Sequence, residues 1–183
     1  MGAALGGLTL FIWSSVSHML LPWHHSTYNK FKDADAVEEV LRANTDANAI
    51  YIAPCGIPEP GASKEEKQAA MAAAMAKMKE GPLIFCSIHP GGGRSFGSSL
   101  GWMFVIDFVV AGILTVLLSY WGHELEFLHK IAIVESVALF SVLSCMVPNW
   151  VWWRFSNRYT AVNILDTLVG FGLAGIVLGL VTP

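Results

Sequence analysis

Charged residues are scarce in this chain. Only 14% of its 183 residues are Asp, Glu, Lys or Arg, whereas 54% are hydrophobic, and its mean hydropathy is +0.53. A soluble domain carries about 25% charged residues, so the composition is too poor in charge for an ordinary water-exposed surface. The net charge of -3 and the lack of a basic stripe give no reason to expect nucleic acid as a partner.

Several motifs of cofactor chemistry are missing as well. There is no His-Glu-x-x-His zinc motif and no CxxCH haem-attachment motif. Gly91-Gly92-Gly93-Arg94-Ser95 resembles a phosphate cradle only loosely, because the Gly-Lys-Ser/Thr of a Walker A loop is absent. We therefore interpret this stretch as a hinge that returns the chain to the membrane.

The three cysteines form no CxxC pair. Cys145 lies in an apolar run and is expected to be a small core residue. Cys55 and Cys86 share one polar region and are expected to form a disulfide only if that region faces an oxidising compartment. The sequence leaves this pairing open.

Long apolar runs dominate what is present. A membrane helix needs about 20 apolar residues to cross roughly 30 Å of hydrocarbon. Trp and Tyr gather at most of the proposed helix ends, as expected at a membrane surface, although Trp13 and Trp102 do not fit this pattern. The first run has no basic start and no A-x-A cleavage site, so we interpret it as an uncleaved helix. The sequence predicts an all-α membrane protein with a four-transmembrane-helix bundle, its helices covering residues 3–23, 100–121, 131–147 and 160–181.

Residues 24–99 form a polar stretch between the first two predicted helices. Asp33 to Asn44 has the pattern of a short helix. Ser63 and Glu66 form a capping box, which predicts a second helix that Gly81-Pro82 ends. The apolar runs 49–53 and 83–88 predict two paired strands. We expect a small α+β insert that rests on the membrane surface.

The distribution of basic residues suggests an orientation. Arg154 and Arg158 lie between the last two predicted helices, whereas the link before the third helix carries Glu124, Glu126 and only Lys130. Short cytoplasmic loops collect Lys and Arg, so the insert, on the same side as the two arginines, is predicted to be cytoplasmic. A periplasmic insert is the alternative, and it would make a Cys55–Cys86 disulfide plausible.

Each predicted membrane helix contains one ionisable residue: His18, Asp107, Glu135 and Asp166. Such groups are costly in a bilayer and usually find a partner inside the bundle. Depths counted at about 1.5 Å per residue place His18, Asp107 and Asp166 in one layer near the insert side, with Asn163 one turn from Asp166, and place Glu135 near the opposite side. This intramembrane polar cluster is open to three interpretations: interhelical hydrogen bonding, a proton or ion pathway, and a site for iron, manganese, zinc or a tetrapyrrole.

Other histidines are candidate ligands. His24, His25 and His89 lie near the insert-side ends of the first two helices and would suit a metal ion if they met. His123 and His129 flank the third helix and are candidates for binding haem or chlorophyll. Against this stands the simpler interpretation that such residues are polar caps at the membrane surface.

Glycines line the first and last predicted helices. Gly175 and Gly179 stand four apart, and Gly2, Gly6 and Gly7 form a similar set. Small residues at this spacing allow close helix approach, within the bundle or against another subunit. The leading hypothesis is therefore a non-catalytic accessory subunit of a larger membrane complex, or a small homo-oligomer.

A loose resemblance spans most of the chain. It is carried by Trp13, His18 and Leu21-Pro22, by Gly81-Pro82 before an apolar run, and by Asn163, Asp166 and Gly170. Together they resemble small integral membrane proteins of bacteria that have no assigned activity. The resemblance implies a multi-pass protein of a bacterial inner membrane and assigns no functional residue.

Overall fold

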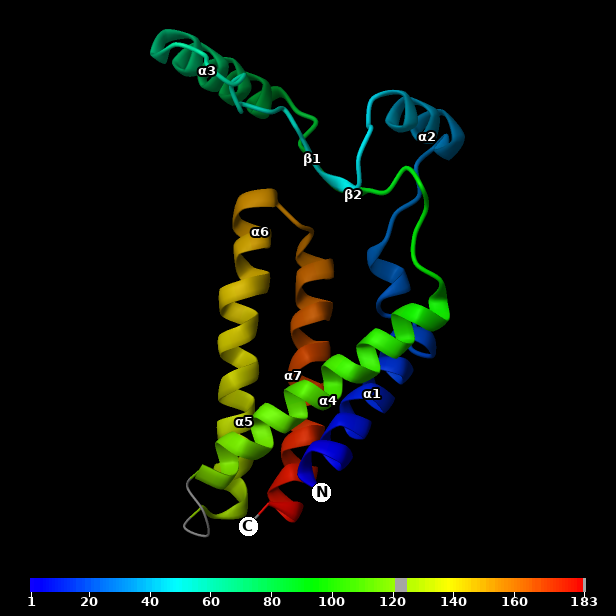
Figure 1. Cartoon of the computed structure of the whole chain (residues 1–183), viewed down its shortest axis with the longest axis vertical. Coiled ribbons are helices and arrows are strands. Elements are labelled where there is room, and N and C mark those ends of the chain that lie inside the picture. The colour runs from blue at the N-terminus through cyan, green and yellow to red at the C-terminus, as the bar shows by residue number, and fades with distance from the viewer. Residues whose placement is uncertain (121–124, 183) are drawn as a thin grey trace. The chain divides into compact units, whose positions relative to one another are not determined.

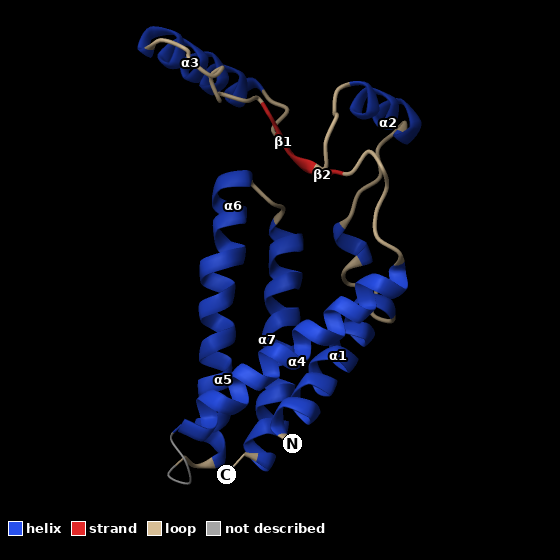
Figure 2. Cartoon of the chain, viewed as in Figure 1, coloured by secondary structure: helices blue, strands red, loops and turns tan. Residues whose placement is uncertain are grey.

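The chain divides into two units in the computed structural model, which describes residues 1–120 and 125–182. The helical unit comprises Met1–Lys30 together with the chain from Arg94 onward, and the insert is Phe31–Gly93. Helices dominate both units, and the only strands among the described residues are two short ones in the insert (Figure 2).

The prediction of four membrane-spanning helices is wrong. Three of the described helices are long and apolar enough to cross a membrane: α4 (Phe96–Tyr120), the continuous helix Phe127–Trp153, and α7 (Asn157–Val181). This is the architecture of a multi-pass membrane protein. The first helix, α1 (Gly2–Met19), is not one of these three membrane-length helices.

Polarity sets α1 apart from the three membrane-length helices. Its 18 residues give roughly 27 Å at 1.5 Å per residue, which is close to the roughly 30 Å of hydrocarbon. Its last turns carry Ser14, Ser15, Ser17 and His18. The predicted continuation to residue 23 does not occur, because the chain leaves the helix after Met19 and turns at Pro22.

The second membrane-length helix continues further than predicted. It consists of α5 (Phe127–Ser141), a π-helical turn at Val142–Met146 and α6 (Val147–Trp153). Pro148 has no amide hydrogen to give to the preceding turn, and the Val147 amide bonds the Val142 carbonyl five residues back. We interpret the π turn as the accommodation that lets the helix pass through Pro148 instead of ending there.

Glycines let α1 lie closely along α4 and α7 (Figure 1). A Cβ at Gly7 would lie 2.9 Å from the Phe108 backbone, and one at Gly6 would lie 3.1 Å from the Ala111 Cβ. On the other side, a Cβ at Gly170 would meet the Trp13 ring at 2.8 Å. The small residues thus serve packing within this chain.

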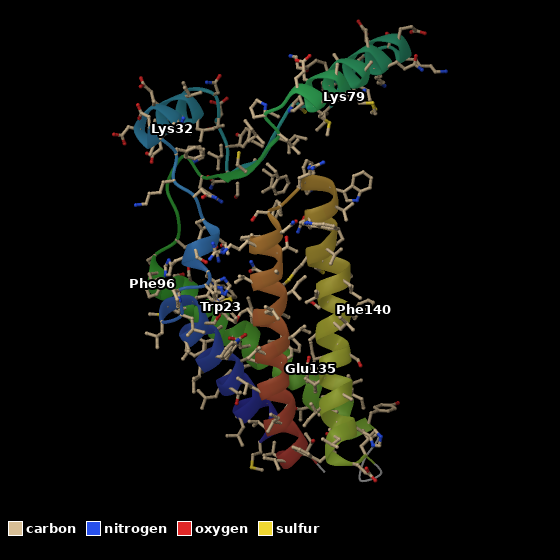
Figure 3. The ribbon with its side chains drawn as sticks, turned by 180° about the vertical axis from the view of Figure 1, so that it is seen from behind. Trp23, Lys32, Lys79, Phe96, Glu135 and Phe140 are labelled. Carbon is tan, nitrogen blue, oxygen red and sulfur yellow. The ribbon has the colours of Figure 1, made fainter. Side chains whose placement is uncertain are left out.

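The outer faces of these helices are apolar. Val109 and Ile113 of α4 and Phe140 of α5 are more than half exposed, and Phe140 points away from the neighbouring helices (Figure 3). In a soluble monomer such a surface would be covered, whereas lipid tails solvate it without cost. The core is correspondingly thin and centres on Leu114, Leu118, Val134 and Leu178.

The insert contains the secondary structure that its sequence predicts. α2 (Ala34–Ala43) is capped by Asp33, and α3 (Lys64–Glu80) begins with the Ser63–Glu66 capping box. β1 (Ala49–Ala53) and β2 (Ile84–Ile88) pair antiparallel, with Tyr51 opposite Cys86. Ala74 is the only buried hydrophobic residue described in this unit, so its core is very small.

The three cysteines are all free. Cys86 donates a weak hydrogen bond to the Tyr51 carbonyl, and Cys55 lies beyond the end of β1. Cys145 is exposed, so the expectation of a buried core residue there is wrong. It lies in the π turn of a helix whose outer face is apolar, where a thiol is tolerated without burial.

Substitution of glycine by alanine tests the α1–α4 packing. Gly7→Ala places a methyl group against the Phe108 backbone and is expected to destabilise the protein by about 1–3 kcal/mol through overpacking. Gly101→Ala is the matched control, because a Cβ there meets nothing within 4 Å and alanine favours helix over glycine. Thermal unfolding of the two variants in detergent should give opposite changes in midpoint, and equal changes would contradict the packing.

Candidate functional site

The chain reverses direction after α1 and returns its next residues to the helix end. The Leu21 amide bonds the Val16 carbonyl at 3.1 Å, and a short 3-10 turn follows at His25–Thr27. The Trp23 indole donates to the Ser17 carbonyl at 3.2 Å and to the Ser17 hydroxyl at 3.0 Å. This turn places His24 beside Ser17, where both side chains are buried.

Asp166 of α7 is the centre of the cluster. Its Oδ1 accepts hydrogen bonds from the Trp13 indole at 2.8 Å and from the Ser17 hydroxyl at 2.5 Å. Its Oδ2 lies 3.3 Å from His24 Nε2 and 3.9 Å from His18 Nδ1. One carboxylate oxygen is therefore held by fixed donors, while the other faces two imidazoles.

The two imidazoles stack on each other. Their ring centroids are 3.9 Å apart and their planes differ by 15°. His24 is buried and meets the edge of the Trp23 ring, whereas the His18 side chain is 53% exposed. His18 Nδ1 lies 3.1 Å from the Ser14 carbonyl. If Nδ1 donates to that carbonyl, Nε2 is the nitrogen that keeps its lone pair.

Burial lowers the pKa of His24 below its ordinary value, and the neighbouring His18 lowers it further, while Asp166 acts in the opposite direction. The net effect favours the neutral ring at neutral pH. A neutral imidazole is the form that binds a metal ion.

His18, His24 and Asp166 form a group whose ligand atoms all lie within 4.8 Å of one another. Two nitrogens and one carboxylate oxygen are donors that zinc, iron and manganese accept. The exposure of His18 leaves one side of the group open to a further ligand such as water.

The neighbourhood of Ser17, His24 and Asp166 does not suit nucleophilic catalysis. In a Ser-His-Asp triad the serine and the carboxylate meet opposite nitrogens of the ring. Here the Ser17 hydroxyl and Asp166 Oδ2 both meet His24 Nε2, at 3.1 Å and 3.3 Å. Ser17 is also fully buried, so a substrate has no route to its oxygen.

The structure brings His18 and Asp166 together, but Asp107 does not join them. Ala111 of α4 and Ala174 of α7 lie in one hydrophobic cluster. Asp107 is four residues before Ala111, and Asp166 is eight residues before Ala174. Asp107 is not part of the group of ligand atoms around Asp166 in the described chain. Its Oδ2 is buried and has no hydrogen-bond partner in the described part of the chain.

The other predicted polar residues have separate environments. The Asn163 amide donates to the Tyr159 carbonyl of its own helix at 2.8 Å. Glu135 lies between α5 and α7 (Figure 3), with Oε1 close to Gly172. Both are outside the group around Asp166.

The remaining histidines do not join the group either. His25 follows His24 in the 3-10 turn and is exposed. His89 belongs to the insert, where its Nε2 lies 3.1 Å from the Ser87 hydroxyl. His129 is 3.9 Å from Glu126, and His123 lies outside the described residues. Binding of haem or chlorophyll there stays a prediction.

Sequence reasoning missed the donors around Asp166. Trp13 and Ser17 are four residues apart, and on a helix this spacing places them on one face. A tryptophan far from the expected aromatic belt was the available signal, since its indole needs a partner when buried.

Two overlapping matches to the Gly-x-Ser-x-Gly pattern also occur, at residues 93–97 and 97–101. A hydrolase nucleophile needs a sharp turn from a strand into a helix. Ser95 instead caps α4, its hydroxyl accepting from the Ser98 amide, and Ser99 lies within α4. In this chain the residues that match the pattern form the beginning of α4.

Trp13→Phe tests the hydrogen bond from the Trp13 indole of α1 to Asp166 of α7. The ring remains while the donor to Oδ1 is lost, so the free energy of unfolding should fall by about 1–2 kcal/mol. Trp102→Phe is the control, because Trp102 is exposed and donates no hydrogen bond to any residue that the structure describes. Thermal unfolding in detergent compares the two variants, and equal stability would contradict this role of Trp13.

No protein-family model, no curated protein and no solved structure matches this chain. The resemblance to small bacterial membrane proteins therefore stays a prediction.

Proposed function

We propose that this chain is a metal-binding membrane protein that holds one divalent transition-metal ion between His18, His24 and Asp166. The observation that carries the proposal is the convergence of three ligand atoms, from α1, from the turn after it and from α7, within 4.8 Å. Intramembrane ionisable groups are functional candidates by default, and this group has the donor types that such an ion requires.

The surroundings of the ligands support the assignment. In metal sites the outer contacts of a ligand fix its orientation. Trp13 and Ser17 hold Asp166 Oδ1, so Oδ2 is the oxygen directed at the imidazoles. The Ser14 carbonyl lies beside His18 Nδ1. These contacts would keep the ligands in place before an ion arrives.

A small ion fits these contacts better than a tetrapyrrole. An axial histidine gives one free nitrogen to a large planar ring. His24 Nε2 is already within 3.3 Å of Ser17 and Asp166, and its ring is stacked against His18. We therefore favour zinc, iron or manganese over haem or chlorophyll at this position.

Metal titration tests the proposal. The purified protein, stripped with chelator and dialysed against Zn²⁺, should retain one ion per chain by elemental analysis. Asp166→Asn keeps an oxygen that Trp13 and Ser17 can donate to but removes the charge, and His24→Gln removes a nitrogen ligand. Both should weaken zinc binding by at least about tenfold.

His25→Gln is the matched control, since His25 is adjacent in sequence, exposed and outside the group. It should bind zinc as the parent does. Equal loss in His25→Gln and His24→Gln, or full zinc retention in Asp166→Asn, would remove this function.

We also propose a location in a bacterial inner membrane with the insert on the cytoplasmic side. If all three membrane-length helices cross, chain connectivity puts residues 31–93 on the same side as Arg154 and Arg158. Basic residues favour the cytoplasmic side. On the other side, Lys130 is buried and donates to the Thr182 carbonyl at the end of α7.

Membership of a larger complex stays a hypothesis. The sequence argument for it was the pair of glycine-rich helix faces. Gly175 and Gly179 lie against Val134 and Phe127 of this chain, and Gly6 lies against Leu178. Any contact with another subunit would therefore use the exposed apolar faces.

Proton or ion translocation is the second candidate, favoured by the buried Asp107 oxygen that has no partner among the described residues. A proton or small cation bound there would satisfy it. Asp107→Asn should abolish a pH-driven flux in liposomes while Asn163→Ala leaves it intact. Absence of flux in the parent protein, or flux unchanged in Asp107→Asn, would eliminate this candidate.

A further inference from the structure

A hollow lies where α6 turns into α7, separate from the site around Asp166. α6 ends at Trp153, and α7 begins at Asn157 with Ser156 as its N-cap (Figure 1). The hollow has a volume of about 560 Å³. Its lining consists of Trp150, Val151, Arg154, Phe155, Ser156 and Asn157.

The walls of the hollow are held by specific contacts. The Trp150 indole donates to the Asn157 side-chain oxygen at 2.7 Å, which ties the last turn of α6 to the first turn of α7. The Phe155 ring meets the Tyr159 ring edge-on at 5.5 Å. The result combines aromatic walls with a cation and polar groups.

Arg154 occupies a backbone conformation that side chains disfavour. Its φ of 54° and ψ of 40° are left-handed. Glycine is the usual residue at such a helix end, and any other residue is strained there. At this helix end the Arg154 side chain is part of the lining of the hollow.

The charge of this region is unbalanced. Neither Arg154 nor Arg158 forms a salt bridge with any residue described in the structure, and no carboxylate lines the hollow. Guanidinium groups bind phosphate oxygens with two parallel hydrogen bonds. A negatively charged phosphate is therefore the complementary ligand.

The position of the hollow bears on where such a phosphate would come from. It lies at the junction of two helices that are long and apolar enough to cross a membrane. Such a junction is at the depth of lipid headgroups, where tryptophan is enriched. Trp150 and Trp152 are 46% and 74% exposed, so their rings are available to acyl chains and glycerol.

We propose that this hollow binds the headgroup of an anionic phospholipid, with Arg154 on the phosphate and the aromatic walls against the glycerol region. The first amides of α7 add to the attraction for the anion. This site is independent of the metal group, and failure of either proposal leaves the other standing.

Arg154→Gly removes the guanidinium without straining the backbone, so it tests lipid binding without destabilising the fold. Glycine adopts a φ of 54° without strain, so the variant should unfold at the same temperature as the parent or higher. Native mass spectrometry from detergent should show one phosphatidylglycerol retained by the parent in preference to phosphatidylcholine. Arg154→Gly should lower that retention by roughly tenfold. Arg42→Gln in α2 is the charge-matched control and should retain the lipid.

Three outcomes would overturn the proposal. One is equal retention of phosphatidylglycerol and phosphatidylcholine by the parent. The second is undiminished phosphatidylglycerol binding in Arg154→Gly. The third is displacement of the lipid by millimolar inorganic phosphate, which would identify a phosphate site instead of a headgroup site.

Discussion

The hydrogen bonds to the Asp166 carboxylate are the interactions on which the helical unit depends. A carboxylate in a membrane-length helix is costly unless donors surround it. α1 and the turn after it supply these donors from Trp13 and Ser17, and they bring His18 and His24 to the remaining oxygen. The same contacts fix α1 against α7 and assemble the candidate metal site, so structure and proposed function rest on one residue.

This arrangement explains why α1 is less apolar than the three membrane-length helices. In its final turns Ser17 and His18 lie against Asp166, whereas Ser14 and Ser15 donate hydrogen bonds to the Phe11 carbonyl of the same helix. Its other turns are rich in glycine, and Gly7 lets it approach α4 closely. On the α7 side, Gly170 leaves room for the Trp13 ring that donates to Asp166.

The sequence predicted the local elements well and the tertiary cluster only partly. The Ser63 cap is confirmed because it depends on neighbouring residues, and strand 49–53 is confirmed because a second apolar run at 84–88 is available to pair with it. Depth along the helices placed His18, Asp107 and Asp166 in one layer. In the structure His18 lies 3.9 Å from Asp166, and Asp107 is not in the group of ligand atoms around Asp166. His24 was missed as a partner of Asp166 because the chain reversal after Met19 depends on Trp23 bonding back to Ser17. Neither the π turn at Val142–Met146 nor the exposure of Cys145 has a signal in residue periodicity.

The central claim is that two imidazoles and one carboxylate of this chain hold a metal ion. X-ray absorption at the zinc edge of protein loaded with one equivalent of Zn²⁺ tests it directly. The account predicts nitrogen and oxygen neighbours at about 2.0–2.2 Å with the scattering pattern of two imidazole rings. A shell of sulfur at about 2.3 Å would assign the zinc to cysteine, and a spectrum without imidazole scattering would equally contradict the account.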